Sequence, residues 1–116
     1  MLRCAPGSVI CVCIGATRRA ANSNLIRLLL KEAYGRVLSN AQRKGDGARA
    51  GDFDWAIDSL RITLALQDTY VTWGELRGVI RTLDEYMQRN GYIEADLEVV
   101  DAAGDVARGY IFDAEH

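Results

Sequence analysis

The sequence has few of the residues on which most enzymatic and metal sites depend. Its single histidine, His116, is the last of the 116 residues, and a terminal side chain is more often mobile than functional. The chain therefore lacks the histidine of a Ser-His or Cys-His nucleophile system and of most zinc sites. Proline also occurs only once, which argues against long disordered or low-complexity segments.

Charge and hydrophobic patterning exclude two classes of partner. The 14 basic and 16 acidic residues are interspersed and give a net charge of −2, whereas a nucleic-acid-binding domain needs a basic face. No run of apolar residues approaches the roughly 20 needed to span a bilayer. We therefore expect neither nucleic acid nor a membrane as a partner. The length and the 49% hydrophobic content predict one globular domain over residues 1–116.

Cysteine is scarce and clustered. Cys4, Cys11 and Cys13 all lie in the first thirteen residues, and an odd, clustered set is not typical of a disulfide framework. On one strand Cys11 and Cys13 would share a face, with Cα atoms about 6.5 Å apart, which is near the limit for bridging. We therefore expect buried or half-buried thiols.

The N-terminal segment allows two interpretations. Arg3, the apolar run 9–14 and the small residues Gly15 and Ala16 loosely match a short signal peptide. The apolar run is short for that purpose and contains two cysteines. We prefer a central β-strand over 9–14, buried on both faces and closed by Gly15. The location stays open between the cytoplasm and secretion with a leader that this chain lacks.

Residues 24–44 have the pattern of an amphipathic helix. Asn22 or Ser23 can cap its start, although Thr17 would allow an earlier one, and Gly45 is a typical stop. The expected inward stripe consists of Ile26, Leu29, Leu30, Ala33 and Val37.

A second helix is predicted over residues 72–89. Thr72 and Glu75 form a capping box, the pair that satisfies backbone amides at a helix start, and Gly91 is placed for a C-terminal stop. Its apolar stripe consists of Leu76, Val79, Ile80, Leu83 and Met87.

The remaining segments alternate with a period of two residues, which is typical of half-buried strands. Together with the helices they predict the order β-α-β-β-α-β-β. The expected fold class is α+β, a two-layer sandwich in which a mostly antiparallel sheet carries two helices on one face. The further strands are expected at 53–57, 60–66, 93–99 and 106–112.

Four features follow one another along nearly the whole chain. An apolar strand ends in Gly15, a Leu-rich helix leads to 45–47, an aromatic-rich strand pair starts at Phe53, and 72–79 reads Thr-Trp-Gly-Glu-Leu-Arg-Gly-Val. In this pattern the chain resembles a group of small fungal proteins, mostly of unknown function and often secreted. The group usually has polar residues where Cys11 and Cys13 stand, and many members carry a secretory leader for which there is no room before the first strand. The resemblance implies no activity.

Carboxylates are the main candidates for catalysis, because paired carboxylates can do acid–base chemistry without histidine. The candidates are Asp84-Glu85 and the alternating Glu94, Asp96 and Glu98. All five fall on helix or strand faces that are expected to be solvated. A charged outer face is therefore the preferred interpretation.

Two other binding sites were considered. Arg18 and Arg19, which follow the first strand, could hold an anion near a helix start, although surface arginines explain the pair equally well. An RNA-recognition sheet would need aromatic rings on its exposed strands. The first strand offers Cys11 and Cys13 at those positions, which disfavours RNA.

Two classes of function remain. We expect a non-enzymatic interaction protein, effector-like or an accessory subunit, that binds a protein partner or a second copy through an apolar surface. The alternative is a small-ligand-binding protein or a carboxylate-based enzyme with a pocket between sheet and helices. No metal or cofactor is predicted. The candidate contact residues are Val9, Cys11 and Cys13 on the sheet and Leu25 and Leu28 on the first helix.

The sheet surface is the preferred one. Ile10, Val12 and Ile14 supply the core side of the first strand, so the apolar residues between them need another cover. Either a terminal segment such as residues 1–6 covers them, or a symmetric second copy does.

Overall fold

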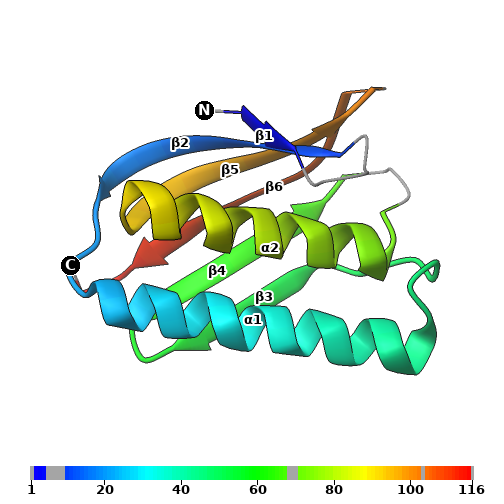
Figure 1. Ribbon diagram of the computed structural model, residues 1–116, viewed down its shortest axis with the longest axis horizontal. Helices are drawn as coiled ribbons and strands as arrows, with labels where there is room; N and C mark the ends of the chain where they lie inside the picture. Colours follow the sequence, from blue (N-terminus) through cyan, green and yellow to red (C-terminus); the bar gives the residue numbers. More distant parts are fainter. Residues whose placement is uncertain (1, 5–9, 68–70, 103, 116) are drawn as a thin grey trace.

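The computed structural model describes residues 2–4, 10–67, 71–102 and 104–115. They form an α+β two-layer sandwich in which a six-stranded sheet carries both helices on one face (Figure 1). The fold class predicted from the sequence is confirmed. In chain order the elements are β1 (Leu2–Cys4), β2 (Cys11–Arg19), α1 (Ser23–Lys44), β3 (Phe53–Ile57), β4 (Leu60–Leu66), α2 (Trp73–Asn90), β5 (Ile93–Asp101) and β6 (Gly104–Asp113).

The strand order across the sheet is β1-β2-β5-β6-β4-β3, and every neighbouring pair is antiparallel. Helix α1 connects β2, next to one edge, with β3 at the other edge, and α2 connects β4 with β5. The C-terminal hairpin of β5 and β6 lies between β2 and β4 in the sheet. The last strand of the chain, β6, therefore lies at the centre of the sheet.

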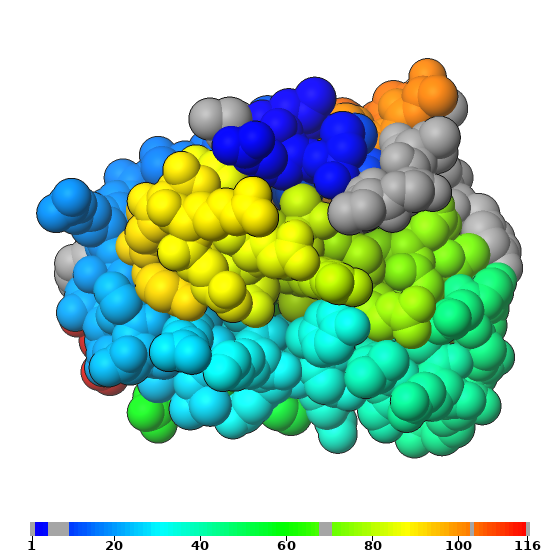
Figure 2. All heavy atoms as spheres, viewed as in Figure 1, coloured from blue at the N-terminus to red at the C-terminus, as the bar shows by residue number. Residues whose placement is uncertain are grey.

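The two helices lie side by side over one face of the sheet, as Figures 1 and 2 show. They contact each other extensively, and β1 lies against α2 (Figure 2). No element in the described part of the chain covers the opposite face of the sheet. Neither helix, within the described residues, is long and apolar enough to cross a bilayer.

Helix α2 begins and ends where its sequence predicts. The Glu75 amide donates to the Thr72 hydroxyl over 3.1 Å, and the Thr72 amide donates to the Glu75 carboxylate over 3.0 Å, which completes the capping box. Gly91 ends the helix with φ 98°, and its amide donates to the Met87 carbonyl. The predicted apolar stripe, including Leu83 with no exposed surface, is buried.

The start of α2 also holds the loop that follows α1. The Trp73 amide donates to the carbonyl of Ala48 and the Gly74 amide to that of Asp46, each over 3.0 Å. A Cβ atom on Gly74 would lie 3.2 Å from that Asp46 oxygen. Arg77 adds two hydrogen bonds to the Asp46 carboxylate at 3.1 and 3.4 Å. The most specific sequence motif therefore has a packing role, because it joins α2 to the 45–48 loop.

Helix α1 also agrees with its prediction. The Asn22 side chain accepts from the Leu25 amide over 3.1 Å and caps the start, and the Gly45 amide donates to the Ala41 carbonyl at the end. All five residues of the predicted inward stripe are buried. The start at Thr17, considered as an alternative, is wrong because that residue belongs to β2.

The first strand differs from its prediction. A strand buried on both faces was predicted over 9–14, whereas β2 runs from Cys11 to Arg19. It buries only one face, through Val12 and Ile14. Cys13, on the other face, is exposed. The strand is second from the edge because β1, which the sequence did not predict, pairs beside it. Residues 2–4 thus extend the sheet sideways instead of folding over its face.

Candidate interaction surface

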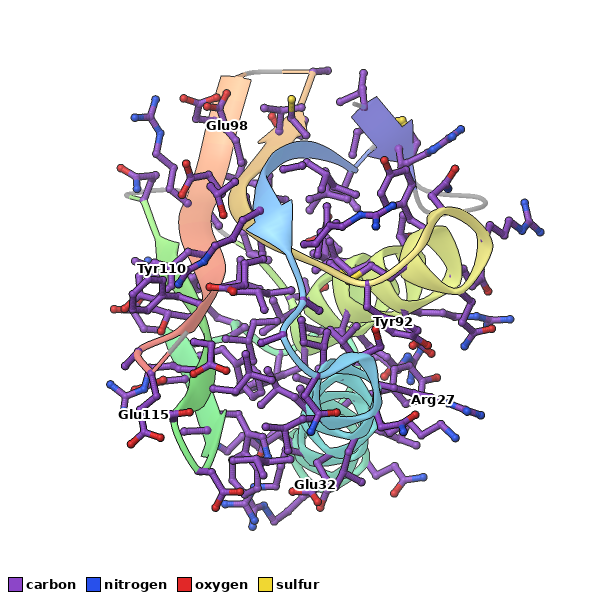
Figure 3. The ribbon with its side chains drawn as sticks, turned by 90° about the vertical axis from the view of Figure 1, so that its left-hand side faces the viewer. Arg27, Glu32, Tyr92, Glu98, Tyr110 and Glu115 are labelled. Atoms are coloured by element: carbon purple, nitrogen blue, oxygen red, sulfur yellow. A yellow bond between two sulfur atoms is a disulfide. The ribbon has the colours of Figure 1, made fainter. Side chains whose placement is uncertain are left out.

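The face of the sheet opposite the helices is called the open face below. Alternate residues of each strand project from it, and the alternation shifts at irregularities between Ala16 and Arg18 and between Val99 and Val100. The cross-strand register places Asp96 of β5, Tyr110 of β6 and Thr63 of β4 in one row across its centre. Figure 3 shows Glu98 and Tyr110 on this side, away from both helices. The open face is therefore the large surface that this fold leaves for a partner.

Two aromatic rings stand at the centre of the open face. Tyr110 and Phe112 project from β6 and meet edge to face, with centroids 6.3 Å apart and an interplanar angle of 88°. They stay 39% and 46% exposed. The Arg18 guanidinium lies 5.8 Å from the Phe112 centroid, within cation–π distance. A shallow depression of about 450 Å³ runs beside these residues and is also lined by Thr17 and Asp96.

Glu94 projects on the open side of β5 but is buried there, which corrects the prediction of a solvated side chain. It is 1% exposed, and its carboxylate accepts from Arg18 Nε over 3.0 Å and from the Asp113 amide over 2.9 Å. Arg18 also donates to the Asp113 carbonyl, and Ser59 donates to the Asp113 carboxylate over 2.6 Å. A buried carboxylate is tolerated because charged and amide donors surround it. This cluster ties β2, β5 and the end of β6 to the β3–β4 turn.

Several other charges of the open face lie close to opposite charges. Strand alternation in the sequence predicts Arg108 and Arg61 on the outer face of the sheet, within reach of Glu94, Asp96 or Glu98. Arg108 of β6 agrees, because it lies 4.0 Å from Glu98, and it lies 2.6 Å from Asp105. The same expectation for Arg61 is wrong, because Arg61 lies 3.3 Å from Asp54 of β3. The hydrogen bond from Arg108 lowers the pKa of the Asp105 carboxyl below its ordinary value. The open face therefore carries ion pairs between its strands and also within β6.

The cysteines differ from the prediction of three unlinked thiols. Cys4 and Cys11 form a disulfide between β1 and β2, and Cys13 is free and exposed. The pairing depends on the short strand β1, which places Cys4 opposite Cys11 and Leu2 opposite Cys13. Sequence spacing alone pointed to Cys11 and Cys13, and it could not reveal this cross-strand pair.

The disulfide is a main support of β1. The strand has only three residues, all exposed, and ordering three residues costs roughly 3–6 kcal/mol. Three register pairs and the cation–π contact of Arg3 with Tyr86, at 5.4 Å, offset part of this cost. Closing the short loop between Cys4 and Cys11 contributes roughly 2–3 kcal/mol more. Without the bond, β1 would be only marginally held at the sheet edge.

The predicted contact residues fall on two separate surfaces. Cys11, half-buried, and Cys13 lie on the open face, whereas Leu25 and Leu28 lie on α1 in the other layer. Leu28 is 46% exposed and Leu25 is half-buried. Val9 lies outside the described residues. The sheet face and the first helix are therefore two alternative surfaces on opposite layers of the molecule.

The proposed anion contacts are also separated. Arg18 is engaged with Glu94 and Asp113, while Arg19 is exposed at the end of β2. Neither lies at the start of α1, where Asn22 caps the helix. Arg18 and Arg19 therefore do not form the predicted anion site at a helix start.

A second depression, of about 510 Å³, lies beside the start of α2. Several of its polar groups bind one another: Thr72 with Glu75, and Asp46 with Arg77. Such mutual pairing leaves few groups directed at a ligand, so this depression supports the small-ligand alternative weakly. The carboxylates of Asp84 and Glu85 hydrogen-bond to Gln88 and Arg81 on the surface of the same helix.

Comparisons with known proteins do not place the chain in a family. No family model, no curated protein and no solved structure matches the chain. The resemblance to small fungal proteins therefore stays a hypothesis. Among the described residues, no group of three or more His, Cys, Asp or Glu side chains could hold a metal ion.

The aromatic pair is the part of the surface that sequence reasoning missed. Tyr110 and Phe112 alternate with Gly109 and Ile111, so they share a face with Arg108, and this signal was present in the sequence. Their importance comes from the strand order, which moves β6 from the end of the chain to the centre of the sheet.

Proposed function

We propose that the protein is a non-enzymatic interaction protein that binds a second copy of itself through the open face. The observation that carries the proposal is the exposed group of Tyr110, Phe112 and Arg18 at the centre of that face. Aromatic residues and arginine are the side chains most enriched at the energetic centres of protein interfaces. The Cys4–Cys11 disulfide favours an oxidising compartment, where such bonds persist.

The area of the open face is close to what a stable dimer needs. Six strands spaced by about 4.8 Å, with about seven residues each, give a face on the order of 650 Å². A standard interface buries about 800 Å² per partner. The open face together with the side chains around its edge therefore provides enough area for a standard interface.

The distribution of charge favours a two-fold arrangement. The acidic residues Asp96 and Glu98 lie on β5, on one side of β6, and Arg61 lies on β4, on the other side. A two-fold axis that runs along β6, between the two sheets, would place β5 of each copy over β4 of the other. Arg61 shares a cross-strand row with Phe112, so it would lie one row along the strand from Asp96 of the other copy, within reach of a long side chain. The rings of the two copies would stack.

Sedimentation velocity across a range of protein concentrations tests the proposal. We expect the wild type to be dimeric at about 100 μM and the double variant Tyr110→Ala/Phe112→Ala to be monomeric. Leu28→Ala is the matched control, because Leu28 is as exposed as Phe112 but lies on α1, and it should leave the dimer unchanged. A wild type that stays monomeric up to 1 mM would overturn self-association.

A charge exchange tests the two-fold geometry. Arg61→Glu alone should weaken the dimer, since it would replace an attraction between Arg61 and Asp96 of the other copy, one cross-strand row apart, with a repulsion. Adding Asp96→Arg should restore most of the lost affinity. If the double variant dimerises no more tightly than Arg61→Glu, the two-fold axis along β6 is excluded. The role of the aromatic pair is then decided by the sedimentation experiment alone.

A further inference from the structure

All three cysteines of the chain lie at the β1–β2 edge of the sheet. Cys4 lies opposite Cys11 in the register, and Cys13 lies two residues further along β2. Alternation along both strands places all three side chains on the open face. Cys4 and Cys13 are exposed, and Cys11 is half-buried. A disulfide and a free thiol are therefore accessible side by side on one surface.

The thiol and the disulfide of one molecule are poorly placed to react with each other. Side chains two residues apart on a strand point the same way, with Cα atoms about 6.5 Å apart, whereas a disulfide needs Cβ atoms about 3.5–4.5 Å apart. The diagonal from Cys13 to Cys4 is about 7–8 Å between Cα atoms. Neither internal product can form unless a strand moves, so the free thiol can coexist with the bond.

We propose that the Cys4–Cys11–Cys13 cluster is a site of thiol–disulfide exchange between two copies of this chain. The Cys13 thiolate of one copy attacks Sγ of Cys4 in the second copy, because Cys4 is the exposed half of the bond. A Cys13–Cys4 disulfide forms between the copies, the Cys4–Cys11 bond of the second copy breaks, and Cys11 leaves as a thiolate that takes a proton from water. The number of disulfides and of thiols is unchanged, so no oxidant or reductant is consumed.

The exchange has a structural consequence for the second copy. Its β1 loses the bond that ties it to β2 and becomes attached to another molecule. The reaction needs contact between two β1–β2 edges and does not need the face-to-face dimer proposed above. The two proposals can therefore fail separately.

The arrangement of the thiols is tested first. The monomer fraction of the native protein, isolated without reductant at pH 6 before exchange proceeds, should take up one iodoacetamide per chain, at Cys13. Alkylation of this monomer at Cys4 or Cys11, or more than one group per chain, would show that the disulfide is absent and would overturn the proposal.

The exchange itself is followed on protein held without oxygen at pH 8 and quenched with acid and N-ethylmaleimide. Non-reducing electrophoresis should show a covalent dimer whose initial rate rises fourfold when the protein concentration doubles. The free-thiol count, measured after denaturation, should stay at one per chain. A fall towards zero would indicate oxidation of Cys13 to a Cys13–Cys13 bond and would overturn the exchange.

Variants separate the two proposals. Cys13→Ser, at an exposed position, should keep the internal disulfide and form no covalent dimer, and prior alkylation of wild-type Cys13 should have the same effect. Tyr110→Ala/Phe112→Ala should still form the covalent dimer, at a rate within about twofold of the wild type. A covalent dimer of Cys13→Ser, or none from the wild type within a day at 0.5 mM, would refute the proposal.

Discussion

Replacing Glu94 with glutamine tests whether the buried carboxylate supports the fold. The substitution keeps the size of the side chain and removes its charge. Wild-type Glu94 accepts from the Asp113 amide over 2.9 Å and from Arg18 Nε over 3.0 Å, at a site that is 1% exposed. A glutamine amide offers only one oxygen, so its NH2 group must face one of these two donors.

The expected cost follows from the two hydrogen bonds. A hydrogen bond to a charged group contributes roughly 1.5–3 kcal/mol, and the bond from the buried Asp113 amide should be within this range. The Arg18 side chain is 39% exposed, so water competes for it, and its bond should contribute less than about 1 kcal/mol. We therefore expect Glu94→Gln to lower the free energy of unfolding by about 2–3 kcal/mol.

Urea unfolding followed by tryptophan fluorescence measures this loss. With a slope of about 1–3 kcal/mol/M for a protein of this size, the midpoint should fall by roughly 1–2 M. Glu98→Gln is the matched control, because Glu98 lies on the same strand and face but its side chain is 45% exposed and 4.0 Å from Arg108. It should cost at most about 0.5 kcal/mol. Equal, small losses for both variants would refute the buried cluster.

Three further predictions address packing and charge. Gly109→Ala should destabilise the protein by more than about 3 kcal/mol, because the new Cβ would lie 1.7 Å from a backbone oxygen of β4. Gly35→Ala, whose new Cβ would have no atom within 4 Å, should stabilise α1 by about 0.5–1 kcal/mol. Thermal unfolding should therefore show a lower midpoint for the first variant and a higher one for the second. Leu83→Ala should cost about 2–5 kcal/mol in urea unfolding, since Leu83 has no exposed surface, and a loss below about 1 kcal/mol would contradict its place in the core. NMR titration should find the pKa of Asp105 below its ordinary value, because of the hydrogen bond from Arg108, and Arg108→Ala should return it. This ion pair favours the folded protein above the unfolded-state pKa, and the contribution is lost as the pH falls through the lower folded-state pKa.

The candidate surface was only partly predictable. The alternation of the first strand correctly placed Cys13 on the uncovered side of the sheet. It did not identify Tyr110 and Phe112, because their exposure at the centre depends on β6 being flanked by β5 and β4. Leu28 was expected on a possible second contact surface on the first helix, and it is indeed exposed there, in the other layer from the sheet residues.

The sequence by itself determined the fold class, both helices and the approximate positions of five of the six strands. Helix ends depend on neighbouring residues, such as Thr72 with Glu75 or the glycine at position 91, and period-two alternation identifies strands from a few residues at a time. These signals are local, so they can be read along the chain without knowing which segments meet.

Tertiary structure decided everything that depends on which segments lie side by side. It paired Cys4 with Cys11 through a three-residue strand too short to show a pattern. It buried Glu94, whose place in the alternation matches that of exposed Asp96, because Arg18 and the end of β6 converge on that one position. The strand order also brought the last strand to the centre of the sheet. No local signal carries this information, since alternation tells which residues share a face but not which strands are neighbours.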